Sequence, residues 1–191
     1  MKVKICGVTR REDALLAADL GAWAVGFIFH QASPRYISPS IAGDIGAALP
    51  PEVLRVGVFV DRSPSEVAEI TRIAGLEVIQ LHGREDPKQY TSLGLPIIKA
   101  VSDLTPVAED LFSVLVDSNN PGTGTKSDWT LAKELSATHR VILSGGLNPD
   151  NIAEGIASVQ PAGVDVASGV EVLPGIKDSV LMRQFFAAVS P

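Results

Sequence analysis

The sequence predicts an α/β protein, folded as a single-domain (β/α)8 barrel that spans residues 1–191. The first reason is that eight short apolar runs recur along the chain, separated by segments long enough for a turn and one helix. The second is composition, because 46% of the residues are hydrophobic but only 5% are aromatic. This mainly aliphatic content is typical of parallel strands that lie buried beneath helices.

Each apolar run is expected to form one strand of a parallel sheet. From the start of one run to the start of the next, the steps are 21, 32, 22, 19, 16, 28 and 23 residues. An open, doubly wound sheet is the alternative fold, but the sequence lacks the GxGxxG turn of a dinucleotide-binding sheet. The predicted strands are 3–6, 24–28, 56–60, 78–81, 97–101, 113–116, 141–144 and 164–167.

Most of the intervening helices are expected to begin where a capping residue directly precedes proline. The capping side chain accepts an unpaired backbone N–H, and proline at the first helical position gives up no hydrogen bond. Asp128 is expected to cap a further helix. Capping boxes are predicted for Thr9 with Glu12 and for Ser63 with Glu66. The residue pairs are Ser38-Pro39, Ser63-Pro64, Asp86-Pro87, Thr105-Pro106 and Asn148-Pro149.

Composition argues against several classes of function. The net charge is -6 and no run of Lys and Arg occurs, so neither nucleic acid nor a membrane surface is an expected partner. The one cysteine excludes an internal disulfide or a CxxC motif. No His or carboxylate cluster has metal-ligand spacing, so we expect no metal. The first strand begins at once and no apolar run is long enough to span a membrane, which predicts a cytoplasmic protein.

The ends of the first and sixth strands carry the two residues best suited to proton transfer. In a barrel of this class the active site lies at the carboxyl ends of the strands. Cys6 shares a strand face with Lys4, whose ammonium group would lower the pKa of the thiol and make it a usable base. Asp117 directly follows the sixth run and would serve as the acid. Alternatively, Cys6 is a small buried core residue and Asp117 a turn former.

Glycine turns follow the last two strands and predict a phosphate site. Gly145 and Gly146 come after the seventh run, and Ser168 and Gly169 after the eighth. Backbone N–H groups in these two turns form the common phosphate site of such barrels. The alternative is that the glycines serve only as turns.

Four further polar residues are weaker candidates. Arg35, in the loop after the second run, would clamp a carboxylate in two-point fashion, or else is an ordinary solvated arginine. His82 ends the fourth run and is expected to be a hydrogen-bonded wall of the pocket. Lys99 lies within the fifth run and would form either a Schiff base or an inward ion pair. Asp165 would either face the pocket or play a polar role in the core.

Several segments, in their order along the chain, resemble the N-(5′-phosphoribosyl)anthranilate isomerase family of tryptophan biosynthesis. The resemblance extends over essentially the whole chain, although Trp23, Pro121 and Ser127 depart from the usual pattern. The last two put the mobility of the loop after the sixth strand in doubt. The segments are Lys4-Ile5-Cys6-Gly7-Val8-Thr9-Arg10, Ser33-Pro34-Arg35-Tyr36-Ile37, Gln80-Leu81-His82-Gly83, Leu115-Val116-Asp117-Ser118, Gly122-Thr123-Gly124, Asp128-Trp129, Ser144-Gly145-Gly146-Leu147 and Ser168-Gly169-Val170-Glu171.

The resemblance implies an Amadori rearrangement of a small phosphorylated aminoaldose, with neither cofactor nor metal. By position, it implies that Cys6 is the general base and Asp117 the general acid that protonates the ring oxygen. It also implies that Arg35 lies beside the anthranilate ring. The phosphate would be held at Gly145, Gly146, Ser168 and Gly169, and His82 and Asp165 complete the predicted substrate site.

Two other functions remain open at the level of sequence. One is a different sugar-phosphate barrel enzyme, such as an aldolase that uses Lys99 as a Schiff base. The other is a barrel that binds a phosphorylated ligand without catalysis. In every case the expected partner is a small phosphorylated molecule, and the chain would act as a monomer or a homodimer.

Overall fold

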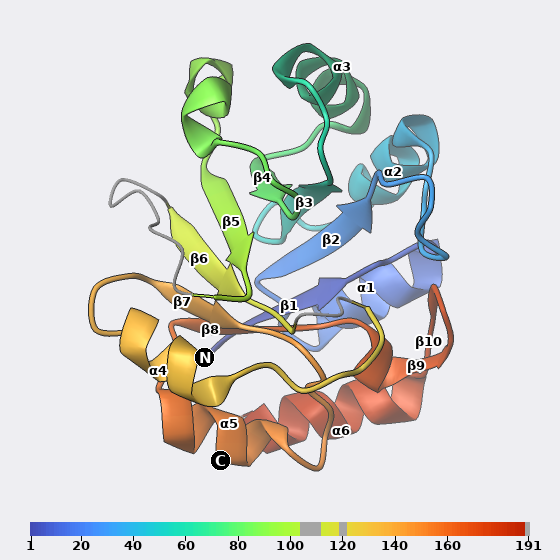
Figure 1. Ribbon diagram of the computed structural model, residues 1–191. Helices are drawn as coiled ribbons and strands as arrows, with labels where there is room; N and C mark the ends of the chain where they lie inside the picture. Colours follow the sequence, from blue (N-terminus) through green and yellow to red (C-terminus); the bar gives the residue numbers. More distant parts are fainter. Residues whose placement is uncertain (104–111, 119–121, 190–191) are drawn as a thin grey trace.

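The computed structural model describes residues 1–103, 112–118 and 122–189. Eight parallel strands form a closed barrel in chain order, with the eighth paired to the first (Figure 1). This confirms the predicted (β/α)8 architecture. The strands are β1 (Lys2–Cys6), β2 (Ala24–Ile28), β3 (Leu54–Phe59), β4 (Val78–Leu81), β5 (Ile97–Val101), β6 (Ser113–Val116), β7 (Val141–Leu143) and β8 (Gly163–Val166).

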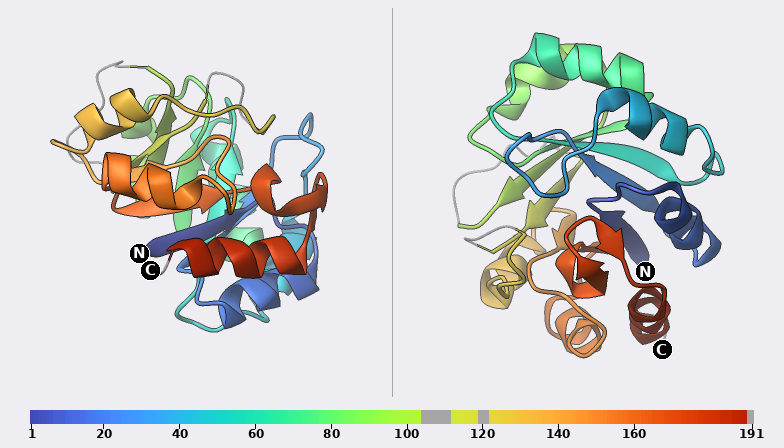
Figure 2. Two further views of the ribbon diagram at one scale, coloured as in Figure 1. Left: turned by 90° about the horizontal axis from the view of Figure 1, so that it is seen from below. Right: turned by 90° about the vertical axis from the view of Figure 1, so that its right-hand side faces the viewer.

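Short helices surround this barrel, as the two views of Figure 2 make plain. Within the described ranges, none has the length and apolar character needed to cross a lipid bilayer. The start predicted at Thr105-Pro106 lies outside the described residues. The α-helices are α1 (Arg11–Asp19), α2 (Pro39–Gly46), α3 (Pro64–Ala74), α4 (Trp129–Leu135), α5 (Ile152–Val159) and α6 (Ser179–Val189), and the 3₁₀ helices are η1 (Pro87–Leu93) and η2 (Ser168–Val170).

One element was not predicted, an antiparallel hairpin of β9 (Glu171–Leu173) and β10 (Ile176–Lys177) between η2 and α6. Its strands are only 3 and 2 residues long, and their alternation is too short to predict a strand. The predicted strands of the barrel, in contrast, agree with β1 to β8 to within two residues at either end.

Three of the predicted caps are confirmed on α-helices. The side chain of Ser38 accepts the N–H of Ile41 at the start of α2. Ser63 and Glu66 form a complete capping box on α3. Asp128 accepts two backbone N–H groups at the start of α4. These caps satisfy donors that would otherwise be left unpaired at the helix ends.

The capping box predicted for Thr9 and Glu12 is wrong. Helix α1 has Arg10 at its N-cap, and no side chain caps it. The Thr9 hydroxyl instead donates to the carbonyl oxygen of Gly175 at 2.6 Å. A tertiary contact with the turn between β9 and β10 therefore replaces the local one.

Two other helix starts differ from prediction in their details. The helix that Asp86 caps, η1, is a 3₁₀ helix and not an α-helix. Helix α5 begins at Ile152, after the predicted start at Asn148. The side chain of Asn148 accepts the backbone N–H groups of Asp150 and Asn151. This local turn delays the helix because it binds the same backbone groups that a cap would.

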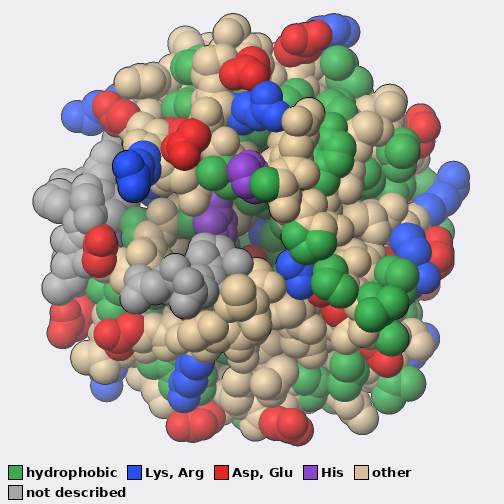
Figure 3. All heavy atoms as spheres, turned by 45° about the vertical axis from the view of Figure 1, so that its right-hand side comes forward, with side chains coloured by type: hydrophobic (Ala, Val, Ile, Leu, Met, Phe, Trp, Pro, Cys, Tyr) green, Lys and Arg blue, Asp and Glu red, His purple; other side chains and the backbone are tan. Residues whose placement is uncertain are grey.

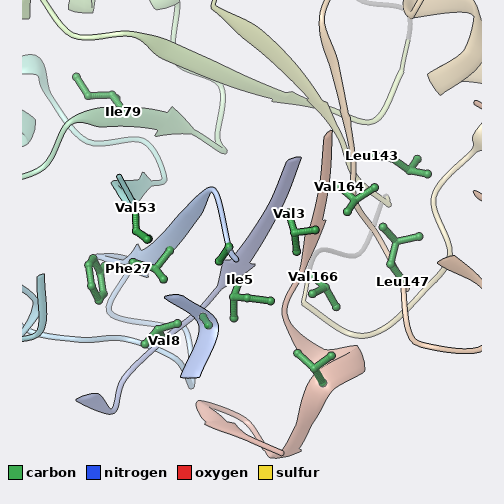
Figure 4. Close-up of a cluster of buried hydrophobic side chains, with 14 of the residues drawn as sticks. Val3, Ile5, Val8, Phe27, Val53, Ile79, Leu143, Leu147, Val164 and Val166 are labelled. Carbon is green, nitrogen blue, oxygen red and sulfur yellow. The ribbon is translucent and has the colours of Figure 1, made fainter. Parts of the chain in front are cut away.

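Side chains of the barrel strands alternate between two apolar layers. One layer lies between the barrel and the helices, and Figure 4 shows Val3 and Ile5 of β1 there, beside Val164 and Val166 of β8. The other layer packs in the barrel interior. The interior layer consists of Ala24, Val56, Val78, Ile98, Leu115 and Ile142.

We expect Ser63→Ala to lower the free energy of unfolding by about 1 kcal/mol, because the first turn of α3 loses its cap. Urea denaturation at neutral pH measures the loss. Ser63→Thr keeps an acceptor oxygen and is the matched control. Equal stability of the wild type and Ser63→Ala would show that the capping box contributes nothing.

Candidate active site

A cavity of about 420 Å³ opens at the carboxyl ends of the barrel strands. Figure 3 shows this face of the molecule, with histidine side chains at its hollow. Of the nine residues predicted for the site, all but Gly169 line the cavity. The structure therefore brings together Cys6, Arg35, His82, Asp117, Gly145, Gly146, Asp165 and Ser168.

A buried ion pair lies next to Cys6 in the barrel interior, and one of its members, Asp165, lines the cavity. Lys4 is fully buried, and its Nζ donates to Asp165 Oδ1 at 2.9 Å. The two residues are register partners on adjacent strands, β1 and β8. A Cβ atom at Gly26 would lie 2.8 Å from Cys6 Sγ and 3.1 Å from Lys4 Nζ. Only glycine at this position therefore leaves room for the thiol and the ammonium group together.

The expectation that Lys4 makes Cys6 an acidic thiol is wrong in its net direction. Burial raises the pKa of the Cys6 thiol above its usual range, and the charge of Asp165 acts in the same direction. The ammonium groups of Lys4 and Lys177 lower that pKa but do not outweigh burial. Lys4 itself stays charged, because Asp165 and Cys6 raise its pKa even though burial opposes the charge.

Arg35 is a buried residue and not the solvated arginine of the alternative prediction. Its Nε and Nη2 atoms bind the carboxylate of Glu171, the shortest distance being 2.7 Å. Its Nη1 lies 3.4 Å from the carbonyl oxygen of Gly122. The two-point contact predicted for Arg35 therefore exists, but with a carboxylate of this chain.

The hairpin supplies a third buried cation, Lys177, which the sequence analysis did not single out. Lys177 Nζ donates to Glu171 Oε1 at 2.8 Å and to the carbonyl oxygens of Cys6 and Ala167 at 2.5 and 3.1 Å. Burial lowers the pKa of Lys177, whereas Lys177 and Arg35 lower the pKa of Glu171 against the effect of burial. Lys177 thus ties the ends of β1 and β8 to the hairpin.

Asp117 is held from two sides at the end of β6. Its Oδ1 accepts the backbone N–H of Ser118 at 2.7 Å, and its Oδ2 lies 3.1 Å from Nε2 of His82. The other ring nitrogen of His82, Nδ1, lies 3.0 Å from Nε2 of Gln80. His82 is therefore the hydrogen-bonded wall residue that the sequence predicts, and Gln80 is an additional member of the site.

The glycine turn after β7 has the geometry of an anion site. Gly145 and Gly146 have φ angles of 79° and 63°, in the region that favours glycine. Within the described part of the chain, no hydrogen bond is formed by the backbone N–H of either residue. A Cβ at Gly146 would lie 2.7 Å from Gly124 O and Lys126 N. The loop after β6 thus packs directly on this turn.

Structural positions are taken up by Gly169, which was predicted for the phosphate site, and by Ser127, which departs from the family pattern. A Cβ at Gly169 would overlap the carbonyl oxygen of Leu147. Glycine at this position therefore allows the turn after β8 to pack closely against the turn after β7. Ser127 donates its hydroxyl to Ser144 O at 2.5 Å. This bond ties the segment before α4 to the end of β7. Pro121 lies outside the described residues.

Lys99 is not placed to form a Schiff base with a ligand in this cavity. Its Nζ donates to Gly83 O at 2.5 Å and lies 3.4 Å from Glu85 Oε2. Lys99 is not one of the described residues that line the cavity. The ion pair that was the second prediction for this residue therefore forms, with Glu85. It does not point inward, because Lys99 shares its strand face with Ile97 of the helix-facing layer, while Ile98 faces the barrel interior.

Comparisons with known proteins identify the family of the chain. The model of the family described as N-(5'phosphoribosyl)anthranilate (PRA) isomerase matches residues 3–188. Two relatives named N-(5'-phosphoribosyl)anthranilate isomerase, from Pelobacter propionicus and Rubrobacter xylanophilus, are 43% and 44% identical. The alignments cover 97% and 98% of this chain, and 93% and 98% of the relatives.

Solved structures give the same result. Phosphoribosyl anthranilate isomerase from Thermus thermophilus superposes with a TM-score of 0.92 at 44% identity, over 100% of this chain and 98% of that one. An isomerase of the same name in complex with reduced 1-(o-carboxyphenylamino)-1-deoxyribulose 5-phosphate gives 0.87 at 37% identity, over 99% and 98%. Because the family model matches residues 3–188 of this chain, the chain belongs to the N-(5'-phosphoribosyl)anthranilate isomerase family.

Proposed function

We propose that this protein catalyses the Amadori rearrangement of N-(5-phosphoribosyl)anthranilate to 1-(2-carboxyphenylamino)-1-deoxyribulose 5-phosphate. The observation that carries the proposal is that Cys6 and Asp117 line one cavity together with the glycine turn after β7. A related isomerase was crystallised with the reduced form of this product. The same cavity thus offers a base, an acid and an anion site to one small molecule.

The first chemical step is assigned to Asp117 as general acid. Asp117 gives a proton to the furanose ring oxygen, the bond from C1 to that oxygen breaks, and the lone pair of the substrate nitrogen forms a C=N bond. The support is that Asp117 lines the cavity at the end of β6, with one carboxylate oxygen fixed by Ser118. Such positioning is what a general acid requires.

The second step is assigned to Cys6 as general base. Its thiolate removes the proton from C2 of the sugar, and the C–H electrons form the C1=C2 bond while the nitrogen takes back its pair. The enol then becomes the ketone by proton transfer. Lys4 and Lys177 support this role because both favour the thiolate. An anionic base in a buried site needs such cations nearby.

The two anionic ends of the substrate are assigned to opposite walls of the cavity. The N–H groups of Gly145 and Gly146, which have no partner among the described residues, would hold the phosphate together with the hydroxyl of Ser168. Arg35 would meet the anthranilate carboxylate through Nη1, because Glu171 occupies its other side. Asp165 would act through Lys4, and not by direct contact with the anions of the substrate.

The remaining assignments follow from the same proposal. We expect residues 1–191 to act as one domain, and the enzyme to work as a monomer or a homodimer. Dimeric and monomeric forms are both named for the isomerase from Thermotoga maritima. A cytoplasmic location suits a substrate that carries two anionic groups and cannot cross a membrane unaided.

We expect Cys6→Ala to lower kcat by at least about 100-fold with little change in KM, because the thiol acts only in proton abstraction. A coupled assay for the aminoketose product measures both constants. If Cys6→Ala keeps a kcat close to that of the wild type, the thiol is a packing residue. The protein would then be a barrel that binds a phosphorylated ligand, or one that uses another base.

Asp117→Asn should lower kcat by about 10² to 10⁴-fold, because an amide cannot donate a full proton. Steady-state kinetics across a range of pH tests this. The variant keeps the shape of the side chain and its contact with Ser118, so its melting temperature serves as the control. A pH–rate profile of the same height and shape as that of the wild type would disprove the assignment.

The protonation of Cys6 can be followed without catalysis, since it is the one cysteine of the chain. Burial raises its pKa, so the thiolate is lost as pH falls through that raised value. The rate of alkylation by iodoacetamide should therefore rise only at a pH above the range of an exposed thiol. Asp165→Asn should move the profile to lower pH and Lys4→Met to higher pH, as mass spectrometry would show. Shifts in the opposite directions would contradict the charge assignments.

A further inference from the structure

A chain of three side chains connects the interior of the barrel to Asp117. Gln80 lies on β4 and is fully buried, and His82 follows directly after that strand. Gln80 Nε2 lies 3.0 Å from His82 Nδ1, and His82 Nε2 lies 3.1 Å from Asp117 Oδ2. The backbone N–H of His82 donates to Phe59 O at 2.8 Å, which fixes the residue to the end of β3. The imidazole ring is thus held at both nitrogens and at its backbone.

The two ring contacts of His82 are chemically linked. A neutral imidazole has one N–H donor and one acceptor nitrogen, so the partner of one nitrogen decides the role of the other. The amide nitrogen of Gln80 can only donate, which makes Nδ1 the acceptor. The proton of the ring then lies on Nε2 and points at Asp117.

Asp117 needs the N–H donor of His82 after it has given its proton to the substrate. Oδ1 already accepts the backbone N–H of Ser118, so Oδ2 is the oxygen from which the acidic proton would leave. When the proton passes to the substrate, the new carboxylate gains negative charge at that oxygen. A preorganised N–H next to it stabilises this charge without rearrangement of the site.

The buried amide of Gln80 destabilises the folded state, which indicates that it is there to orient His82. Its Oε1 is buried and has no hydrogen-bond partner in the described part of the chain. A buried polar atom without a partner destabilises the folded state. An apolar side chain of similar length would avoid this cost, so folding does not explain the amide. The contact of Gln80 with His82 does.

We propose that Gln80 and His82 are positioning residues for Asp117. Gln80 fixes the tautomer of His82, and His82 then donates to the carboxylate that Asp117 becomes after it protonates the substrate. The proposal rests on the proposed function, in which Asp117 is the general acid. His82 transfers no proton to the substrate.

The test compares the wild type with Gln80→Met, His82→Gln and Asp117→Asn. Nitrogen-15 NMR of the imidazole ring, with His139→Gln as a control for assignment, should find the His82 proton on Nε2 in the wild type. His139 lies after α4 and contacts Thr138. In Gln80→Met the proton should be shared between the two ring nitrogens. A proton on Nδ1 in the wild type, or the same tautomer in Gln80→Met, would overturn the proposal.

Kinetics and stability supply the second readout. Gln80→Met and His82→Gln should lower kcat by about 10- to 100-fold, the range expected for one hydrogen bond to a charged group, with KM little changed. Gln80→Met should nevertheless melt at or near the temperature of the wild type, because it removes an unpaired amide oxygen. If kcat falls only in proportion to the melting temperature, Gln80 and His82 have structural roles and the proposal is wrong.

The two levels of inference can fail separately. If Asp117→Asn is as active as the wild type, the acid is misassigned and the proposed function needs revision. If Asp117→Asn is inactive while Gln80→Met and His82→Gln keep full kcat, the isomerase assignment stands. In that case only the positioning role is wrong.

Discussion

Closure of the barrel imposes one constraint on which the rest of the site depends. Every second side chain of a strand must enter an interior without water, so a polar residue there needs a partner from a neighbouring strand. Lys4 meets this requirement because the register of β1 and β8 sets it opposite Asp165. Cys6 is the next inward residue of the same strand. The ion pair thus both fills the barrel and forms the surroundings of the thiol.

Two of the buried cations in the upper barrel share one carboxylate, and this matters for the ligand. Lys4 is paired with Asp165, whereas Arg35 and Lys177 both bind Glu171. The chain as a whole carries a net charge of -6. Buried cations at the cavity, of which Arg35 lines it directly, therefore counter the unfavourable overall field for an anionic ligand.

The hairpin after β8 has a larger role than its size suggests. It supplies Glu171, which holds Arg35, and Lys177, which holds the carbonyl oxygen at Cys6. A segment of a few residues thus connects the wall proposed for the carboxylate with the strand that bears the proposed base. A substitution of Glu171 would disturb both Arg35 and Lys177, because the two side chains bind the same carboxylate.

The local signals in the sequence determined the strands, three helix caps and the two strand-end residues Cys6 and Asp117. These features depend on neighbours within a few positions, and alternation or capping chemistry reveals them directly. The tertiary structure alone decided how charges pair, since the partners of Lys4 and Arg35 lie 161 and 136 residues away along the chain. It also decided the direction of the thiol pKa, because burial is a property of the packed barrel. A sequence lists charged groups, but only the fold sets the distances and the exclusion of water on which their energies depend.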